Sequence, residues 1–200
     1  IGSVFGEPSG WGSLWRRWDP HVHLPGTLLN DQFGSTSVPD ALEALAGRDP
    51  GIEAIGVTDY VTTASYRRAQ AALDDGVAPT IALAFPNVEL RLDNATSKER
   101  GVNVHLMCPP EEVDLLDDLL GRLEFSFRDR SYRADRNGLI RLGRDFNDDQ
   151  TLGDDDALRV GALQFKVTFE NLRQVLGNDS WARRSVLVGV AAGTNDGSSG

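Results

Sequence analysis

The chain has a single cysteine, Cys108, among its 200 residues, so it cannot form an internal disulfide bond. A chain without disulfides fits a reducing compartment, and we expect a cytoplasmic protein. No run of eighteen apolar residues is present and no signal peptide opens the chain, so neither a membrane span nor secretion is expected. Methionine is also scarce: the chain begins with Ile1, and Met107 is its single methionine. Because no initiator methionine is present, we expect a fragment of a longer protein.

The composition is that of a folded domain with an acidic balance. Hydrophobic residues make up 40% and charged residues 25% of the chain, values typical of globular proteins large enough to bury a core. The net charge of −10 argues against a general nucleic-acid coat protein and against anionic membranes as partners. The net charge does not exclude a local basic site, because residues 122–144 hold seven arginines and three acidic residues, a net charge of +4.

Histidine occurs only three times, and each histidine falls in a short strand-like segment. His21 and His23 are two residues apart, and His105 lies in the apolar run 102–107. Residues two apart on a strand point to the same face, so Asp19, His21 and His23 are expected to project together. Imidazole nitrogens and carboxylate oxygens on one face suit a Zn-, Mn- or Fe-type ion. The alternative is a pair of hydrogen-bonded core histidines.

Strand-like and helix-like segments alternate along the chain, which predicts an α/β fold with a mostly parallel sheet and helices outside it. Periodicity alone leaves open whether the sheet is open or closed into a barrel. Residues 124–150 are expected to be irregular, with a small hairpin followed by a loop. The expected strands cover residues 17–23, 53–58, 80–92, 102–107, 163–167 and 185–191, and the expected helices cover 37–47, 63–75, 109–123, a short stretch from 154, and 168–176.

Polar residues recur near the ends of these strands. Barrel enzymes build their sites at the carboxyl ends of parallel strands, so recurrence over four consecutive strands favours one shared site. Taken singly, Asp59 is explained as well by a helix cap, and Glu89 by a solvated position on an edge strand. The residues concerned are Asp19, His21, His23, Asp59, Glu89 and His105, followed by Asn195 and Asp196 after the last strand.

Four motifs in this order resemble the PHP superfamily, the polymerase and histidinol phosphatase domains. The resemblance covers about residues 15–110. Within that superfamily the chain is most similar to PHP domains at the N-terminus of long bacterial proteins with an ATPase region, some of them linked to phage defence. The motifs are Asp19–His23, Val57–Tyr60, Asn87–Leu90 and Val104–Leu106.

The resemblance implies a distorted (β/α)7 PHP barrel over residues 15–200, incomplete at its C-terminus. Residues 1–14 precede it and are expected to be loose, because this stretch is rich in glycine and serine. It implies a metal-dependent phosphoesterase, including a nuclease module, that hydrolyses phosphodiester or phosphomonoester bonds with metal-activated water. Two or three divalent ions (Zn, Mn, Fe or Mg) would be its cofactors. An ATPase region or subunit beyond this chain would be its partner.

The resemblance also assigns roles to single residues. His21 and His23 would hold one metal ion, and Glu89 would bridge two. His105 would hold another. The predicted metal ligands are His21, His23, Glu89, His105 and Asp19, and the predicted catalytic residues are Asp59 and Glu89.

The chain departs from the family pattern in two places. Tyr60 stands where the family usually has a ligand histidine, and a phenol is a poor ligand at neutral pH. No histidine follows His105 to supply the family's last ligands. Either these lie beyond Gly200, or Asn195 and Asp196 substitute for them, or the site is degenerate. The alternative function is therefore a scaffold or nucleic-acid-contact domain that lacks catalysis.

The arginine-rich segment supplies predicted substrate contacts. Arginine binds phosphate bidentately, so Arg128, Arg130 and Arg133 are predicted to contact a phosphoester or nucleic-acid substrate. Asn195 and Asp196 join them, because the glycine-rich loop after the last strand could present N–H groups to phosphate. The alternatives are a solvated hairpin whose arginines pair with nearby acids, and a flexible loop.

Overall fold

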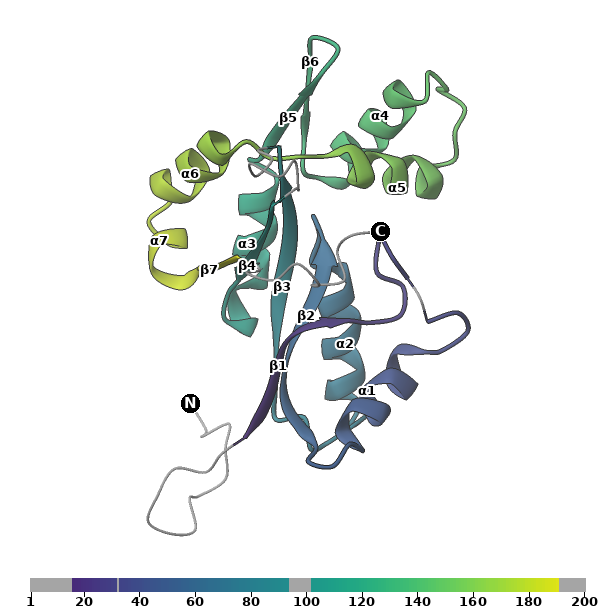
Figure 1. The fold of residues 1–200 in the computed structure, drawn as a ribbon, viewed down its shortest axis with the longest axis vertical. Coiled ribbons are helices and arrows are strands. Elements are labelled where there is room, and N and C mark those ends of the chain that lie inside the picture. Colours follow the sequence, from purple (N-terminus) through teal and green to yellow (C-terminus); the bar gives the residue numbers. More distant parts are fainter. Residues whose placement is uncertain (1–15, 32, 94–101, 191–200) are drawn as a thin grey trace.

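The computed structural model describes residues 16–31, 33–93 and 102–190, which form a central sheet with helices around it (Figure 1). The predicted N-terminal segment 1–14 lies outside the described residues. The elements are β1 (Arg17–His23), α1 (Val38–Ala46), β2 (Ile52–Tyr60), α2 (Ala64–Asp74), β3 (Leu83–Leu92), β4 (Val102–Met107), a short 3-10 helix η1 (Pro110–Glu112), α3 (Val113–Leu120), β5 (Glu124–Phe127), β6 (Arg130–Arg133), α4 (Arg136–Phe146), α5 (Asp154–Gln164), α6 (Phe169–Asn178), α7 (Ala182–Ser185) and β7 (Leu187–Val190).

The main sheet has the strand order β1-β2-β3-β4-β7 and curls like half of a barrel, a mixed α/β arrangement compatible with a barrel-like fold. β1, β2 and β3 run parallel, with α1 and α2 as the crossovers between them. β4 is antiparallel to both β3 and β7, so the prediction of a mostly parallel sheet is wrong for this half. Only nine residues separate β3 from β4, and a parallel crossover needs about a dozen or more.

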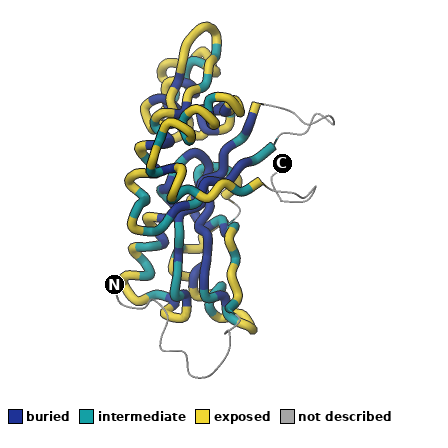
Figure 2. Tube along the Cα trace, turned by 90° about the vertical axis from the view of Figure 1, so that its left-hand side faces the viewer, coloured by how far each residue is buried: buried dark blue, intermediate teal, exposed yellow. Residues whose placement is uncertain are grey.

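The two faces of the sheet carry different residues. On one face, side chains such as Val88, Leu90 and Leu106 are buried against the leucines of α3. A second apolar cluster joins β1 and β2 to α1 and α2, and includes Ile55 and Leu42. Figure 2 shows the buried strands at the centre and mostly exposed chain at the upper end. The opposite face of the sheet, which carries the polar residues of β2, β3 and β4, is the one on which the candidate site forms.

The first strand bulges where the sequence motif carries its proline. The pairing of β1 with β2 is irregular between Asp19 and Val22. Pro20 lies in this bulge, and a Cβ added to Gly56 would be only 2.1 Å from the Pro20 carbonyl oxygen. Glycine at position 56 is therefore required for β1 to pass this close to β2.

The region expected to be irregular, residues 124–150, contains the hairpin β5–β6 and the helix α4. The prediction of a loop after the hairpin is therefore wrong. Gly138 and Gly143 lower the helix propensity of this stretch, which conceals the helix in the sequence. In the fold, a Cβ at Gly143 or at Gly161 would lie 1.9 Å from a carbonyl oxygen of the other helix. The glycines thus allow α4 and α5 to pack backbone against backbone.

The remaining expected elements are confirmed within a few residues, except the strand at 163–167. α5 continues through Gln164, and Val167 forms only an isolated bridge with Leu92. A short apolar run fits a helix end as well as a strand, so periodicity could not separate the two. A capping box at Ser37 begins α1, at the residue where the sequence places the start of this helix. Among the described residues, no helix has the length and apolar character needed to cross a bilayer.

Candidate metal centre

Sheet register places the predicted ligands on one face. Tyr60 of β2 is paired with Glu89 of β3, and Glu89 is paired with His105 of β4. Paired residues point to the same side of a sheet, so these side chains stand next to one another. At the end of β1, the rings of His21 and His23 lie 4.9 Å apart between centroids. The structure thus brings together four of the predicted metal ligands from three strands.

The donor atoms form two overlapping triads. Nε2 of His21 lies 3.0 Å from Nε2 of His23, and each of these atoms is 3.6 Å from Oε2 of Glu89. In the second triad, one ligand atom each of His21, Glu89 and His105 lie within 4.8 Å of one another. His21 and Glu89 therefore belong to both triads.

This spacing is suited to a bound metal ion. Two ligands that bind one ion at about 2.1 Å are about 3.0 to 3.4 Å apart in octahedral or tetrahedral geometry. The triad of His21, His23 and Glu89 is close to this range, and the triad with His105 is wider. Moreover, Oε2 of Glu89 is buried and accepts no hydrogen bond within the described part of the chain. A buried carboxylate normally pairs or ligates a metal, so these residues fit a divalent cation.

Glu89 is ionised in this setting. Its side chain is only 1% exposed. Burial would raise the pKa of its carboxyl, but the adjacent imidazoles of His21 and His23, together with the charge of His105, lower that pKa to about 2. The carboxylate is therefore in its metal-binding form at neutral pH.

Tyr60 borders the cluster without adding a good ligand. Its ring stacks on that of His23, with centroids 5.3 Å apart and an angle of 18° between the planes. Burial, and then the negative charge of Glu89, raise the pKa of the Tyr60 phenol, so the phenol is neutral at pH 7. Its hydroxyl accepts a hydrogen bond of 3.1 Å from the side chain of Asn30. The guanidinium of Arg91 lies 5.4 Å from the ring centroid and adds a positive charge here.

The two other predicted acids lie outside the ligand triads. Asp19 accepts a hydrogen bond of 3.1 Å from the backbone N–H of His21, within the β1 bulge. Asp59 is buried and alternates with Tyr60, so it points to the helix-covered face, where it accepts a hydrogen bond of 2.5 Å from Ser65 at the start of α2. Burial raises the pKa of the Asp59 carboxyl. The metal role of Asp19 and the catalytic role of Asp59 stay predictions.

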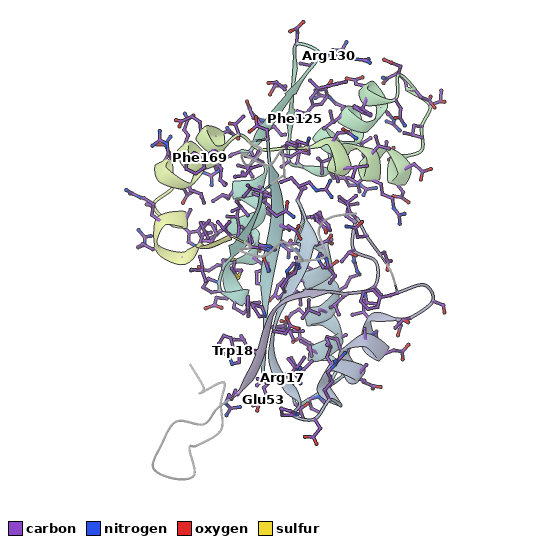
Figure 3. All side chains as sticks on the ribbon, viewed as in Figure 1. Arg17, Trp18, Glu53, Phe125, Arg130 and Phe169 are labelled. Atoms are coloured by element: carbon purple, nitrogen blue, oxygen red, sulfur yellow. The ribbon has the colours of Figure 1, made fainter. Side chains whose placement is uncertain are left out.

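The predicted substrate arginines form ion pairs of their own. They lie on the hairpin β5–β6, which projects from the upper end of the molecule in Figure 1, with Arg130 near its tip in Figure 3. Their pairing matches the alternative of a solvated hairpin, and contact with a substrate stays a prediction. Asn195 and Asp196 lie outside the described residues. The pairs are Arg128–Asp148, Arg130–Asp145 at 2.9 Å and Arg133–Glu124 at 3.7 Å.

Sequence reasoning missed two amides beside the ligands. Asn103 donates a hydrogen bond of 2.6 Å to Oε1 of Glu89, and the Oδ1 atom of Asn87 lies 3.1 Å from Nδ1 of His105. A signal for them was present, because strand alternation puts residues two positions from Glu89 and from His105 on the same face as these ligands.

No family model matches the chain, and no curated protein matches it. A solved structure that is similar to this fold is that of a presumed metal-dependent phosphoesterase from Bifidobacterium adolescentis. The TM-score is 0.34 and the sequence identity is 19%. The match covers 80% of this chain and 49% of the other, so the chain spans about half the length of that protein.

Proposed function

We propose that this chain carries the metal site of a phosphoesterase in a PHP-type barrel, with His21, His23, Glu89 and His105 as its ligands. The observation that carries the proposal is the buried Oε2 of Glu89, which faces two imidazole nitrogens and has no hydrogen-bond donor among the described residues. A divalent ion bound there supplies a Lewis acid for phosphoryl oxygens and activates water.

Different residues of the chain would supply the charge, the neutral ligand atoms and the attraction for the substrate anion at such a site. Glu89 provides the negative charge shared by the two triads, and the imidazoles provide neutral donors. Arg91 stands two positions beyond Glu89 on the same strand face and would attract the phosphoryl anion toward the ligands. We further propose a phosphodiester substrate in nucleic acid and an ATPase region or subunit as partner.

Metal content and hydrolysis of model esters test this function together. The full chain is loaded with Mn²⁺ or Zn²⁺ and assayed with bis(p-nitrophenyl) phosphate and p-nitrophenyl phosphate. His21→Ala is expected to reduce bound metal and to bring hydrolysis to background, whereas Glu124→Gln, on the exposed hairpin, should change neither. Hydrolysis that persists undiminished in His21→Ala would contradict the assignment.

A second candidate function is a PHP-like scaffold that has lost its chemistry. Tyr60 favours it, because a neutral phenol stacks on His23 at the position where the family has a ligand histidine. In the same experiment, stoichiometric metal binding without hydrolysis of either ester would favour the scaffold over the enzyme.

A further inference from the structure

Two asparagines lie directly behind the candidate ligands. Asn87 is 3% exposed on β3, two residues before Glu89, and its side-chain nitrogen donates a hydrogen bond of 2.8 Å to the carbonyl of Pro20. Its oxygen lies 3.1 Å from Nδ1 of His105. A continuous hydrogen-bond chain therefore runs from the β1 bulge across β3 to the histidine of β4.

The chemistry of this chain of atoms fixes the proton on His105. The carbonyl of Pro20 can only accept, so the amide atom of Asn87 that faces it must be the NH2 group. The other amide atom is then the oxygen, which can also only accept. Nδ1 of His105 must therefore carry a proton and donate it to Asn87. In a neutral imidazole this leaves Nε2 with a lone pair.

Asn103 acts in the same way on Glu89. Its NH2 group donates to Oε1 of Glu89 at 2.6 Å, which occupies that oxygen. The other oxygen, Oε2, is left facing the Nε2 atoms of His21 and His23. Each amide thus engages one atom of a ligand residue.

We propose that Asn87 and Asn103 are positioning residues that select the Nε2 lone pair of His105 and Oε2 of Glu89 for one metal centre. The metal half of this inference rests on the proposed function, whereas the proton placement does not. Groups that hydrogen-bond to metal ligands set the tautomer and orientation of those ligands. Because both groups are neutral amides, they add no charge, and Glu89 remains the anion common to both triads.

The anchor of this arrangement is the backbone of the bulge. The Pro20 carbonyl comes within reach of Asn87 only because Gly56 has no Cβ, which would lie 2.1 Å from that oxygen. The proline of the sequence motif and a glycine thirty-six positions later thus act together on His105.

Proton placement is tested on the metal-free wild-type chain. Two-dimensional ¹H–¹⁵N spectra of the side chains, recorded where imidazole is neutral, distinguish a protonated ring nitrogen from an unprotonated one. We expect Nδ1 of His105 to carry the proton, with the signals assigned by comparison with His105→Gln. A protonated Nε2 and a bare Nδ1 would overturn the inference, whether or not the protein binds metal.

Metal affinity tests the positioning role. Asn87→Leu and Asn103→Leu are expected to weaken Zn²⁺ binding about 10- to 100-fold, as found for groups that orient metal ligands. Asn137→Leu, at an exposed position of α4, should leave the affinity unchanged. Folded Asn87→Leu and Asn103→Leu variants with wild-type affinity would refute the positioning role. If Asn87→Leu does not fold, Asn103→Leu carries the test, and wild-type Zn²⁺ affinity in that folded variant would refute the positioning role.

A wild-type chain that takes up no Zn²⁺ or Mn²⁺ would refute the proposed function and the positioning role together. The proton placement on His105 would then still stand or fall on the spectra alone. The two failures are therefore distinguishable.

Discussion

The polar face of the sheet and the arginine-rich hairpin β5–β6 both carry ionisable side chains, but the two regions differ in how far these side chains are buried and how they are paired. On the sheet, Glu89 is buried, two imidazoles face its Oε2 atom, and no donor in the described part of the chain hydrogen-bonds to that atom. On the hairpin, Arg130 is well exposed and paired with Asp145.

The contrast shows which feature points to a ligand site. Exposed ion pairs satisfy one another at the surface and contribute little to stability or specificity. A buried carboxylate oxygen that accepts no hydrogen bond is costly, and such a group persists where a ligand offsets the cost. Charge density alone would have favoured the hairpin, whereas burial and hydrogen bonding favour the sheet.

The largest expected effect is that of Glu89→Gln. The change removes the anion of both triads but keeps an oxygen that can accept from Asn103. We expect metal affinity to fall about a hundredfold or more, with the thermal melting of the metal-free protein nearly unchanged. Calorimetric titration with Zn²⁺ and a melting curve measure the two quantities. Unaltered metal binding in a protein that melts much earlier would instead identify Glu89 as a structural carboxylate.

Gly56→Ala should destabilise the polar face through the backbone. The added Cβ meets the Pro20 carbonyl oxygen at 2.1 Å, so β1 must shift, and we expect a loss of about 2 to 4 kcal/mol in the free energy of unfolding. Urea denaturation measures it. Gly177→Ala is the matched control, because its Cβ would meet nothing within 4 Å on α6. That control should stabilise by about 0.5 kcal/mol, and equal effects of the two changes would refute the close approach.

Removing the hairpin arginines should have a smaller effect. The triple variant Arg128/Arg130/Arg133→Ala is expected to retain its metal and to melt near the wild-type temperature, because exposed ion pairs contribute little. The same variant tests nucleic-acid binding in a salt titration with an oligonucleotide. The slope of log affinity against log salt falls by about one unit for each phosphate that the variant no longer neutralises. Identical slopes would leave the arginines as surface ion-pair residues.

The smallest expected effect is at Cys108, a buried group outside both regions. Burial, and then the charges of Glu112 and Asp117, raise the pKa of its thiol to about 12. The folded protein should therefore leave a thiol reagent at about pH 8 unconsumed, and the denatured protein should consume one equivalent. Rapid reaction of the folded chain would show that this part of the core opens readily.

Much of the fold followed from local patterns. The capping box at Ser37, the apolar stripe of α3 and the alternation along β3 are local signals, and the structure confirms the elements that they predict. The direction of β4 was not predictable from its own residues, because it depends on the length of the connection from β3. α4 was missed because its glycines serve the packing against α5, which no local window contains.

The candidate site likewise combines features that the local sequence sets with features that depend on tertiary packing. By itself, the sequence determined that His21 and His23 share a strand and that Glu89 and His105 stand on others, since spacing within a strand is a local property. Only the tertiary structure decided that Oε2 of Glu89 is buried beside two imidazoles, that Asn87 and Asn103 hydrogen-bond to the ligands, and that Asp59 turns to the helices. These facts depend on the register between strands that are distant in sequence, and on a β1 bulge that Gly56 permits. Register is set by the packing of the whole domain, which no single motif contains.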